Sequence, residues 1–84
     1  MKGLKVGSKY VFYVAVSRED LMVTSGTFVG YRLLGEDAAV CVKLDETHGE
    51  KKGQIRIIPI SFIAAIDIVE ENSESETTED IYYS

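Results

Sequence analysis

The residue types that most often perform chemistry are scarce in this chain, which holds one cysteine and one histidine among its 84 residues. Cys41 has no second cysteine with which to form a disulfide, and Cys41 and His48 do not make the ligand spacing of a metal site. A reactive thiol needs a basic neighbourhood, and a general base needs a partner and a pocket. We therefore expect Cys41 to be a small packing or surface residue and His48 to be an exposed loop residue.

Other arrangements that would indicate an enzyme do not occur in the sequence either. We find no pair of carboxylates with a plausible pocket, no nucleophile elbow and no glycine-rich phosphate loop. The sequence therefore predicts a protein that is not an enzyme and that uses no cofactor and no metal.

Charge divides the chain into two parts. The chain has fourteen acidic and nine basic residues, and six of the acidic residues but none of the basic ones lie in residues 70–84. Residues 1–69 are therefore close to neutral. A polar, like-charged stretch buries too little apolar surface to offset its ordering entropy. We expect one domain over residues 1–69 and an acidic, disordered tail over residues 70–84. The end of that tail, Ile81-Tyr82-Tyr83, is either a frayed terminus or a short docking motif for a protein partner.

Hydrophobic periodicity predicts an all-β fold. Alternating and β-branched stretches are typical of strands, and short polar or glycine-containing segments separate them here. Pro59 cannot donate to a sheet ladder, so we expect it to end a strand or to lie at an edge, followed by a tight 3₁₀-like connection. The expected strands are Tyr10–Val16, Leu21–Leu33, Ala38–Leu44, Gln54–Ile58 and Ile63–Val69. Five strands with short connections favour a small, strongly bent antiparallel barrel.

Two glycines, Gly26 and Gly30, interrupt the second expected strand. Glycine inside a strand marks a bend, a bulge or a close backbone approach, so we expect the structural bend here. A barrel of this size leaves open strand edges and has no disulfide to staple its core, which favours a homo-oligomer. The candidate edges are Val40–Leu44 and Ile55–Ile58, with Ile63–Val69 as the alternative.

The order of these features resembles the Sm-like (LSm) family, in which five-stranded bent barrels assemble into rings that bind RNA. Asp20 lies six residues before the run Gly-Thr-Phe-Val-Gly-Tyr at Gly26–Tyr31, which resembles the first family motif. Val40–Glu46 resembles the third strand of the family with its acidic end, and Ile58–Ile66 resembles the second motif. The resemblance covers residues 10–69 and implies an Sm-like barrel in a closed ring.

The residues that bind a base in the family are changed in this chain. Arg32 stands where the first motif has an aspartate, no asparagine follows Tyr31 before Leu44, and Pro59 and Ile60 replace the Arg-Gly of the second motif. The resemblance thus implies fold and ring assembly more than binding of uridine-rich RNA. Two rings, one cation and one hydroxyl remain near the implied pore, and they are the candidate RNA-binding residues. These are Tyr31, Arg32, Ser61 and Phe62.

Two functions from different classes remain open. The first is a ring-forming scaffold that binds single-stranded RNA weakly, because a neutral body gives no strong field and an acidic tail repels phosphate. The second is an SH3-like or Tudor-like protein-interaction module whose clustered aromatic side chains form a peptide groove, or else serve only as core and interface. Those side chains are Tyr10, Phe12, Tyr13 and Tyr31.

The expected location is the cytoplasm. Lys2, Lys5 and Lys9 interrupt the apolar residues near the start, which disfavours a secretory signal, and no apolar run approaches the ~18 residues that span a membrane. The single cysteine suits a reducing compartment.

Overall fold

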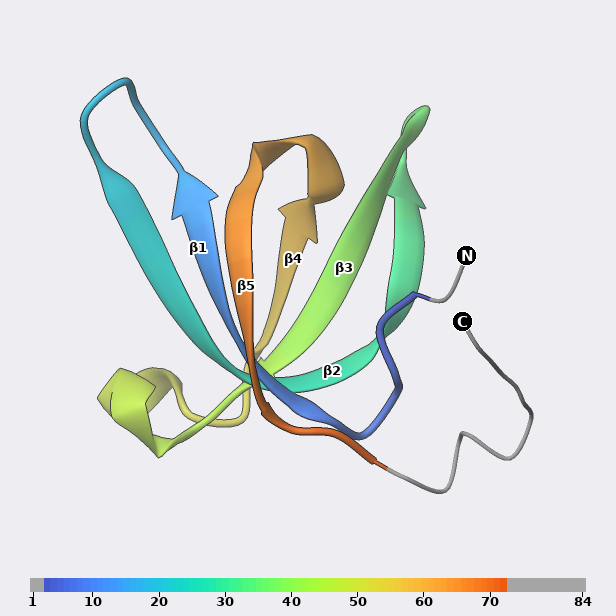
Figure 1. Ribbon diagram of the computed structural model, residues 1–84, viewed down its shortest axis with the longest axis vertical. Coiled ribbons are helices and arrows are strands. Elements are labelled where there is room, and N and C mark those ends of the chain that lie inside the picture. Colours follow the sequence, from blue (N-terminus) through green and yellow to red (C-terminus); the bar gives the residue numbers. More distant parts are fainter. Residues whose placement is uncertain (1–2, 73–84) are drawn as a thin grey trace.

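The computed structural model describes residues 3–72, and over that range the chain is all-β (Figure 1). Within these residues five antiparallel strands form one sheet in the order β4-β3-β2-β1-β5. The strands are β1 Lys9–Ala15, β2 Leu21–Leu34, β3 Asp37–Leu44, β4 Ile55–Pro59 and β5 Ile63–Glu70, with 3₁₀ segments η1 Glu46–Lys51 after β3 and η2 Ile60–Phe62 after β4. The five expected strands are confirmed, each to within one residue at either end.

Strand β2 bends so strongly that its first half pairs with β1 and its second half with β3 (Figure 1). Gly26 lies where the two ladders overlap, opposite Tyr10 on β1 and Leu44 on β3. A Cβ atom on Gly26 would collide with the carbonyl oxygen of Lys43, so the close approach of β2 and β3 requires glycine. Gly30 has a φ of +143° and follows a register shift in the β2–β3 ladder, which identifies a β-bulge.

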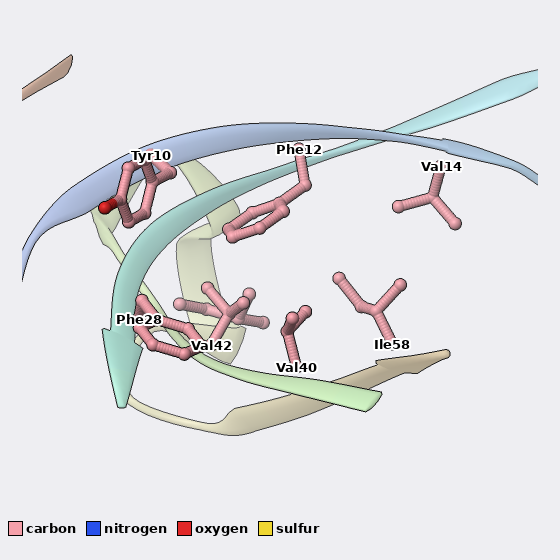
Figure 2. Close-up of a cluster of buried hydrophobic side chains, with 8 residues drawn as sticks. Tyr10, Phe12, Val14, Phe28, Val40, Val42 and Ile58 are labelled. Atoms are coloured by element: carbon pink, nitrogen blue, oxygen red, sulfur yellow. The ribbon is translucent and has the colours of Figure 1, made fainter. Parts of the chain in front are cut away.

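The core lies on the concave face of this bent sheet (Figure 2). Side chains at alternate positions of β1 and β3 point into it, as the two-residue period of a strand requires. The ring of Tyr10 packs edge-on against Phe12 and Phe28, with centroids 5.9 and 6.4 Å apart. Each fully buried large side chain contributes about 1.5–3 kcal/mol. The buried cluster is Tyr10, Phe12, Val14, Phe28, Val40, Val42, Leu44 and Ile58.

The sheet curls like a barrel but does not close. Over residues 3–72, β4 pairs only with β3, and β5 pairs only with β1. The expectation of an edge at Val40–Leu44 is wrong, because this stretch belongs to β3, which pairs on both sides and is buried on both faces from Ala39 to Val42. The open edges are β4, as expected, and β5, the alternative.

The described fold continues past residue 69. Glu70 is the last residue of β5, and the Glu71 carboxylate accepts a hydrogen bond of 3.1 Å from the Tyr10 hydroxyl. The backbone N–H of Asn72 donates to Ser8 Oγ at 2.6 Å. Residues 70–72 of the expected tail therefore contact the body. The rest of that tail, residues 73–84, lies outside the described residues.

Candidate functional site

An apolar cavity of about 400 Å³ opens between the inner face of β5 and the end of β2. Its walls come from the N-terminal segment, β2, β3, η2, β5 and the residue that follows β5. The lining residues are Gly3, Leu4, Tyr31, Val40, Ile60, Ile63, Ile66, Ile68 and Glu71. A concave, mostly aliphatic surface with a few polar groups at its rim suits an apolar side chain or ligand with a polar tip.

Strand β5 supplies one wall of the cavity through three isoleucines. Ile63, Ile66 and Ile68 lie opposite Val14, Phe12 and Tyr10 of β1, whose side chains form the core. Ile63 and Ile66 pack against that core, whereas Ile68 is 63 % exposed. The sequence predicts only part of this inward-facing set of isoleucines. Ile66 and Ile68 alternate as expected, but a register shift between Tyr13 and Val14 of β1 places Ile63 inward as well.

Tyr31 is the one candidate RNA-binding residue that lines the cavity. Its ring packs edge-on against Phe28 at a centroid distance of 4.9 Å, and its hydroxyl accepts a hydrogen bond of 3.0 Å from the Leu4 backbone N–H. The residue is nevertheless 52 % exposed. Tyr31 therefore presents a fixed ring at the mouth of the cavity.

The other three candidates lie outside the cavity lining. Arg32 is exposed on β2 opposite Ala39, and Ala39 pairs in turn with Pro59, which precedes η2. Ser61 and Phe62 are exposed on η2, with Phe62 at 53 %. Arg32 on β2 and the start of η2 are thus separated by strand β3, at the same end of the sheet. Within residues 3–72, no hydrogen bond or ring contact joins any of the four candidates to another.

A polar cluster closes the rim of the cavity where the chain leaves β5. The Tyr10 hydroxyl accepts a bond of 2.9 Å from the Lys5 backbone N–H and donates to Glu71, whose carboxylate lies 3.9 Å from the Lys5 ammonium. Burial raises the pKa of Tyr10, and the Glu71 carboxylate raises it further, against an opposing effect of the Lys5 bond. The cluster fixes the position of Glu71 beside the cavity.

A second polar cluster joins η1 to β2. Asp45 accepts hydrogen bonds from Ser25 Oγ at 2.6 Å and from Thr47 Oγ1 at 2.7 Å, and His48 Nε2 accepts one from the Ser25 backbone N–H at 2.9 Å. The expectation of an exposed His48 is wrong, because η1 folds back and leaves the imidazole half-buried against β2. Serine, histidine and aspartate meet here, but the serine hydroxyl donates to the aspartate, so the histidine does not activate it as a base would.

The pKa of Asp45 reflects that second cluster. Desolvation acts to raise the pKa, but hydrogen bonds from Ser25 and Thr47, helped by His48, outweigh it and hold the pKa below its usual value. Asp45 is also the N-cap of η1, since its side chain accepts the Thr47 backbone N–H. The arrangement is that of a structural cap.

The four aromatic side chains of the alternative peptide groove lie in different environments in the structure. Tyr10 and Phe12 are fully buried in the core. Tyr13 is half-buried and donates to Asp67 of β5 at 2.8 Å, while Tyr31 lines the cavity. Two of the four rings are therefore core residues, which matches the alternative that these side chains serve packing.

The remaining chemically capable groups form no further site in the described part of the chain. Cys41 is buried on β3, consistent with a packing role. Among residues 3–72 no cluster of three or more histidine, cysteine, aspartate or glutamate side chains is arranged to hold a metal ion. In the same range, no helix has the length and apolar character needed to cross a membrane.

Comparisons with protein-family models, with curated proteins and with solved structures each find no match for this chain.

Proposed function

We propose that this chain is a ring-forming, Sm-like scaffold in which the β4 edge of one copy pairs with the β5 edge of the next. The observation that carries the proposal is the pair of open edges on a strongly bent sheet. An open edge presents unpaired backbone N–H and C=O groups that another strand can bind.

The side chains along both edges favour pairing. Natural edges are usually protected by free charges. Of the three charged residues in β4 and β5, Glu70 is the last residue of β5, and the other two have partners within the chain. Arg56 of β4 donates to Thr24 at 2.7 Å, and Asp67 of β5 accepts from Tyr13. Exposed apolar side chains flank them, with Ile55 52 % and Val69 60 % exposed.

The geometry of the edges limits the contact to a short ladder. Register shifts interrupt the β1–β5 ladder at both ends of β5, so its regular part runs from Ala65 to Ile68. The facing β4 has five residues and ends at Pro59, which cannot donate. A head-to-tail contact of this kind closes into a ring when its rotation divides a full turn.

The proposal includes RNA binding only with low affinity. Tyr31 and Phe62 offer exposed rings on which a base can stack, and Arg32 offers one cation. Stacking on an aromatic ring contributes roughly 1–3 kcal/mol per base. A ring of copies would repeat that contact once per subunit and so add avidity.

The proposal is tested with two single-edge variants. Ile55→Lys places a charge on the β4 edge, and Ala65→Lys places one on the exposed, regular part of the β5 edge. Leu21→Lys is the matched control, because Leu21 is 57 % exposed at the start of β2, an interior strand. Sedimentation velocity should show dissociation of both edge variants and an unchanged particle for the control.

Mixing the two edge variants gives the decisive result. Each variant keeps one intact edge, and the intact edges are complementary, so a head-to-tail contact predicts a 1:1 dimer in the mixture and nothing larger. Edge variants that retain the wild-type mass, or a mixture that stays monomeric after both variants have dissociated, would contradict the proposed β4–β5 contact.

A further inference from the structure

We propose that the apolar cavity is the docking site for the chain's own segment Ile81-Tyr82-Tyr83. The chain reaches residue 72 at the cavity itself, because Glu71 forms part of the lining. Asn72 is held there by bonds from its backbone N–H to Ser8 Oγ and from its side-chain Nδ2 to the Val6 carbonyl at 3.2 Å. The segment that follows therefore starts from a fixed point at the rim.

The length of the intervening chain allows the segment to reach the cavity. Ile81 lies nine residues after Asn72. An extended chain spans at most about 3.3–3.6 Å per residue, which gives nine residues a reach of roughly 30 Å. Because the chain starts at the rim, it has ample length to turn back and enter the cavity.

The chemistry of the segment matches that of the cavity. Residues 73–80 are all polar or acidic, and Ile81, Tyr82 and Tyr83 are the only apolar residues after position 72. Aliphatic and aromatic side chains gain by leaving water for the isoleucine wall of β5. A buried tyrosine still needs a partner for its hydroxyl, and the Glu71 carboxylate at the rim has acceptor sites besides the one used by Tyr10.

Attachment to the same chain favours this occupant over a free peptide. A short tether holds its end at an effective concentration in the millimolar range. The cavity is lined by the inner face of β5, and the backbone edge of β5 that would pair with another copy remains free. Docking in the cavity therefore does not depend on the proposed ring. Docking by apolar contact should persist at high salt, because salt screens charge interactions and not apolar burial.

The test uses the full chain with labelled isoleucine methyl groups and protonated tyrosine rings in a deuterated background. We expect nuclear Overhauser cross peaks from the methyl groups of Ile66 and Ile68 to the rings of Tyr82 and Tyr83. The double variant Tyr82→Ser/Tyr83→Ser should lose these peaks and shift the methyl resonances of the cavity. The control Thr77→Ala/Thr78→Ala, in the same segment, should retain them.

A second pair of variants tests the cavity wall. Ile68→Ser should abolish the peaks between Ile66 and the two tyrosines. Val69→Ser should retain them, since Val69 is exposed to a similar extent, 60 % against 63 %, but does not line the cavity. If Ile68→Ser does not fold, the variants at positions 77–83 still test whether the segment docks, because they leave residues 3–72 unchanged.

Two results would overturn the inference. One is a wild-type spectrum without the cross peaks, with cavity methyl resonances identical to those of Tyr82→Ser/Tyr83→Ser. The other is a mixture of methyl-labelled and tyrosine-labelled chains in which the peaks arise between different chains, which would assign the cavity to a second copy. The edge variants can lose the ring and still show the cross peaks. That result would leave intramolecular docking intact, because the cavity does not involve the β4–β5 contact.

Discussion

Two glycines in β2 are required for different physical reasons. At Gly26 the space for a side chain is filled by the backbone of Lys43. At Gly30 no atom beyond the two neighbouring residues in the chain lies within 4 Å of the place that a Cβ atom would occupy, so the positive φ is what disfavours other residues. A non-glycine residue in such a backbone region costs about 1–3 kcal/mol.

We therefore expect both Gly26→Ala and Gly30→Ala to lower the free energy of unfolding, with the larger loss at Gly26. Gly30→Ala should cost about 1–3 kcal/mol, because the strain is local. Gly26→Ala should cost more, because β2 and β3 must separate. Urea unfolding measures both, with exposed Val29→Ala as a control within about 0.5 kcal/mol of wild type. Equal stability of Gly30→Ala and wild type would show that the bulge imposes no strain.

The hydroxyl of Tyr10 joins the core to the N-terminal segment and to Glu71. Tyr10→Phe keeps the ring and removes the bonds to Lys5 and Glu71, so it should cost about 1–3 kcal/mol of unfolding free energy. The raised pKa also has a consequence for pH dependence. An unfolded tyrosine ionises near pH 10, before the folded one, so the stability contributed by Tyr10 is present below about pH 10 and is lost as pH rises further.

Unfolding measured from about pH 8 to about pH 11 separates these effects. The stability of Tyr10→Phe should fall less steeply above about pH 10 than that of wild type. Tyr13→Phe is the comparison. The hydrogen bond to Asp67 also raises the pKa of Tyr13, but that bond is exposed, so its loss should change the stability less than the loss of the Tyr10 hydroxyl, both near neutral pH and above about pH 10. Parallel curves for Tyr10→Phe and wild type would mean that the hydroxyl is not held as described.

At the scale of elements, η1 is attached to β2 by the Asp45 cluster. The pKa of Asp45 is lowered in the folded protein, so its stabilising effect is present above the unfolded pKa of about 4 and is lost as pH falls through the lower folded value. Asp45→Asn should therefore reduce the steepness of acid unfolding between about pH 4 and pH 2. Asp37→Asn, at the exposed start of β3, is the control and should follow the wild-type curve.

The strands could be predicted from the sequence because local patterns specify them. Tyr10, Phe12 and Val14 alternate with half-exposed residues, and Pro59 marks the end of an edge strand. The position of β3 in the sheet could not be predicted in this way, because the pattern of one strand does not record which strands lie beside it. The same limit applies to the cavity, whose walls come from segments more than sixty residues apart in the sequence.

The sequence places the four candidate residues on their elements but does not show which of them meet. Tyr31 and Arg32 lie on one strand, and Ser61 and Phe62 on one 3₁₀ turn, whereas the presence of Tyr31 alone among them in the cavity lining depends on segments that are distant in the sequence. The burial of His48 against Ser25 depends on how η1 folds back across 23 residues of sequence, and no local pattern indicates it.

At the scale of the whole molecule, charge should decide how RNA binds. The proposed stacking residues are few, and each chain carries an acidic segment that lowers the attraction for phosphate. We expect little binding of oligo-uridine by the wild-type chain at physiological salt. Neutralising the acidic residues after position 72 should raise the affinity, chiefly at low salt, where screening is least. The variant carries Glu74→Gln, Glu76→Gln, Glu79→Gln and Asp80→Asn.

Fluorescence anisotropy with labelled oligo-uridine measures this effect, and Arg32→Gln in the neutralised background tests the single cation. Arg32→Gln should reduce the gain at low salt. Tight, salt-resistant and uridine-selective binding by the wild-type chain would contradict weak stacking and would require a base pocket of another kind.

The open β4 and β5 edges are proposed to join copies of this chain into a closed ring. The most direct test is the mass of the wild-type particle, measured by light scattering after size exclusion at several micromolar concentrations. A closed ring predicts one discrete multiple of the 9.3 kDa chain mass that does not change with concentration. A 9.3 kDa monomer at micromolar concentration, or a mass that grows continuously with concentration, would contradict the account.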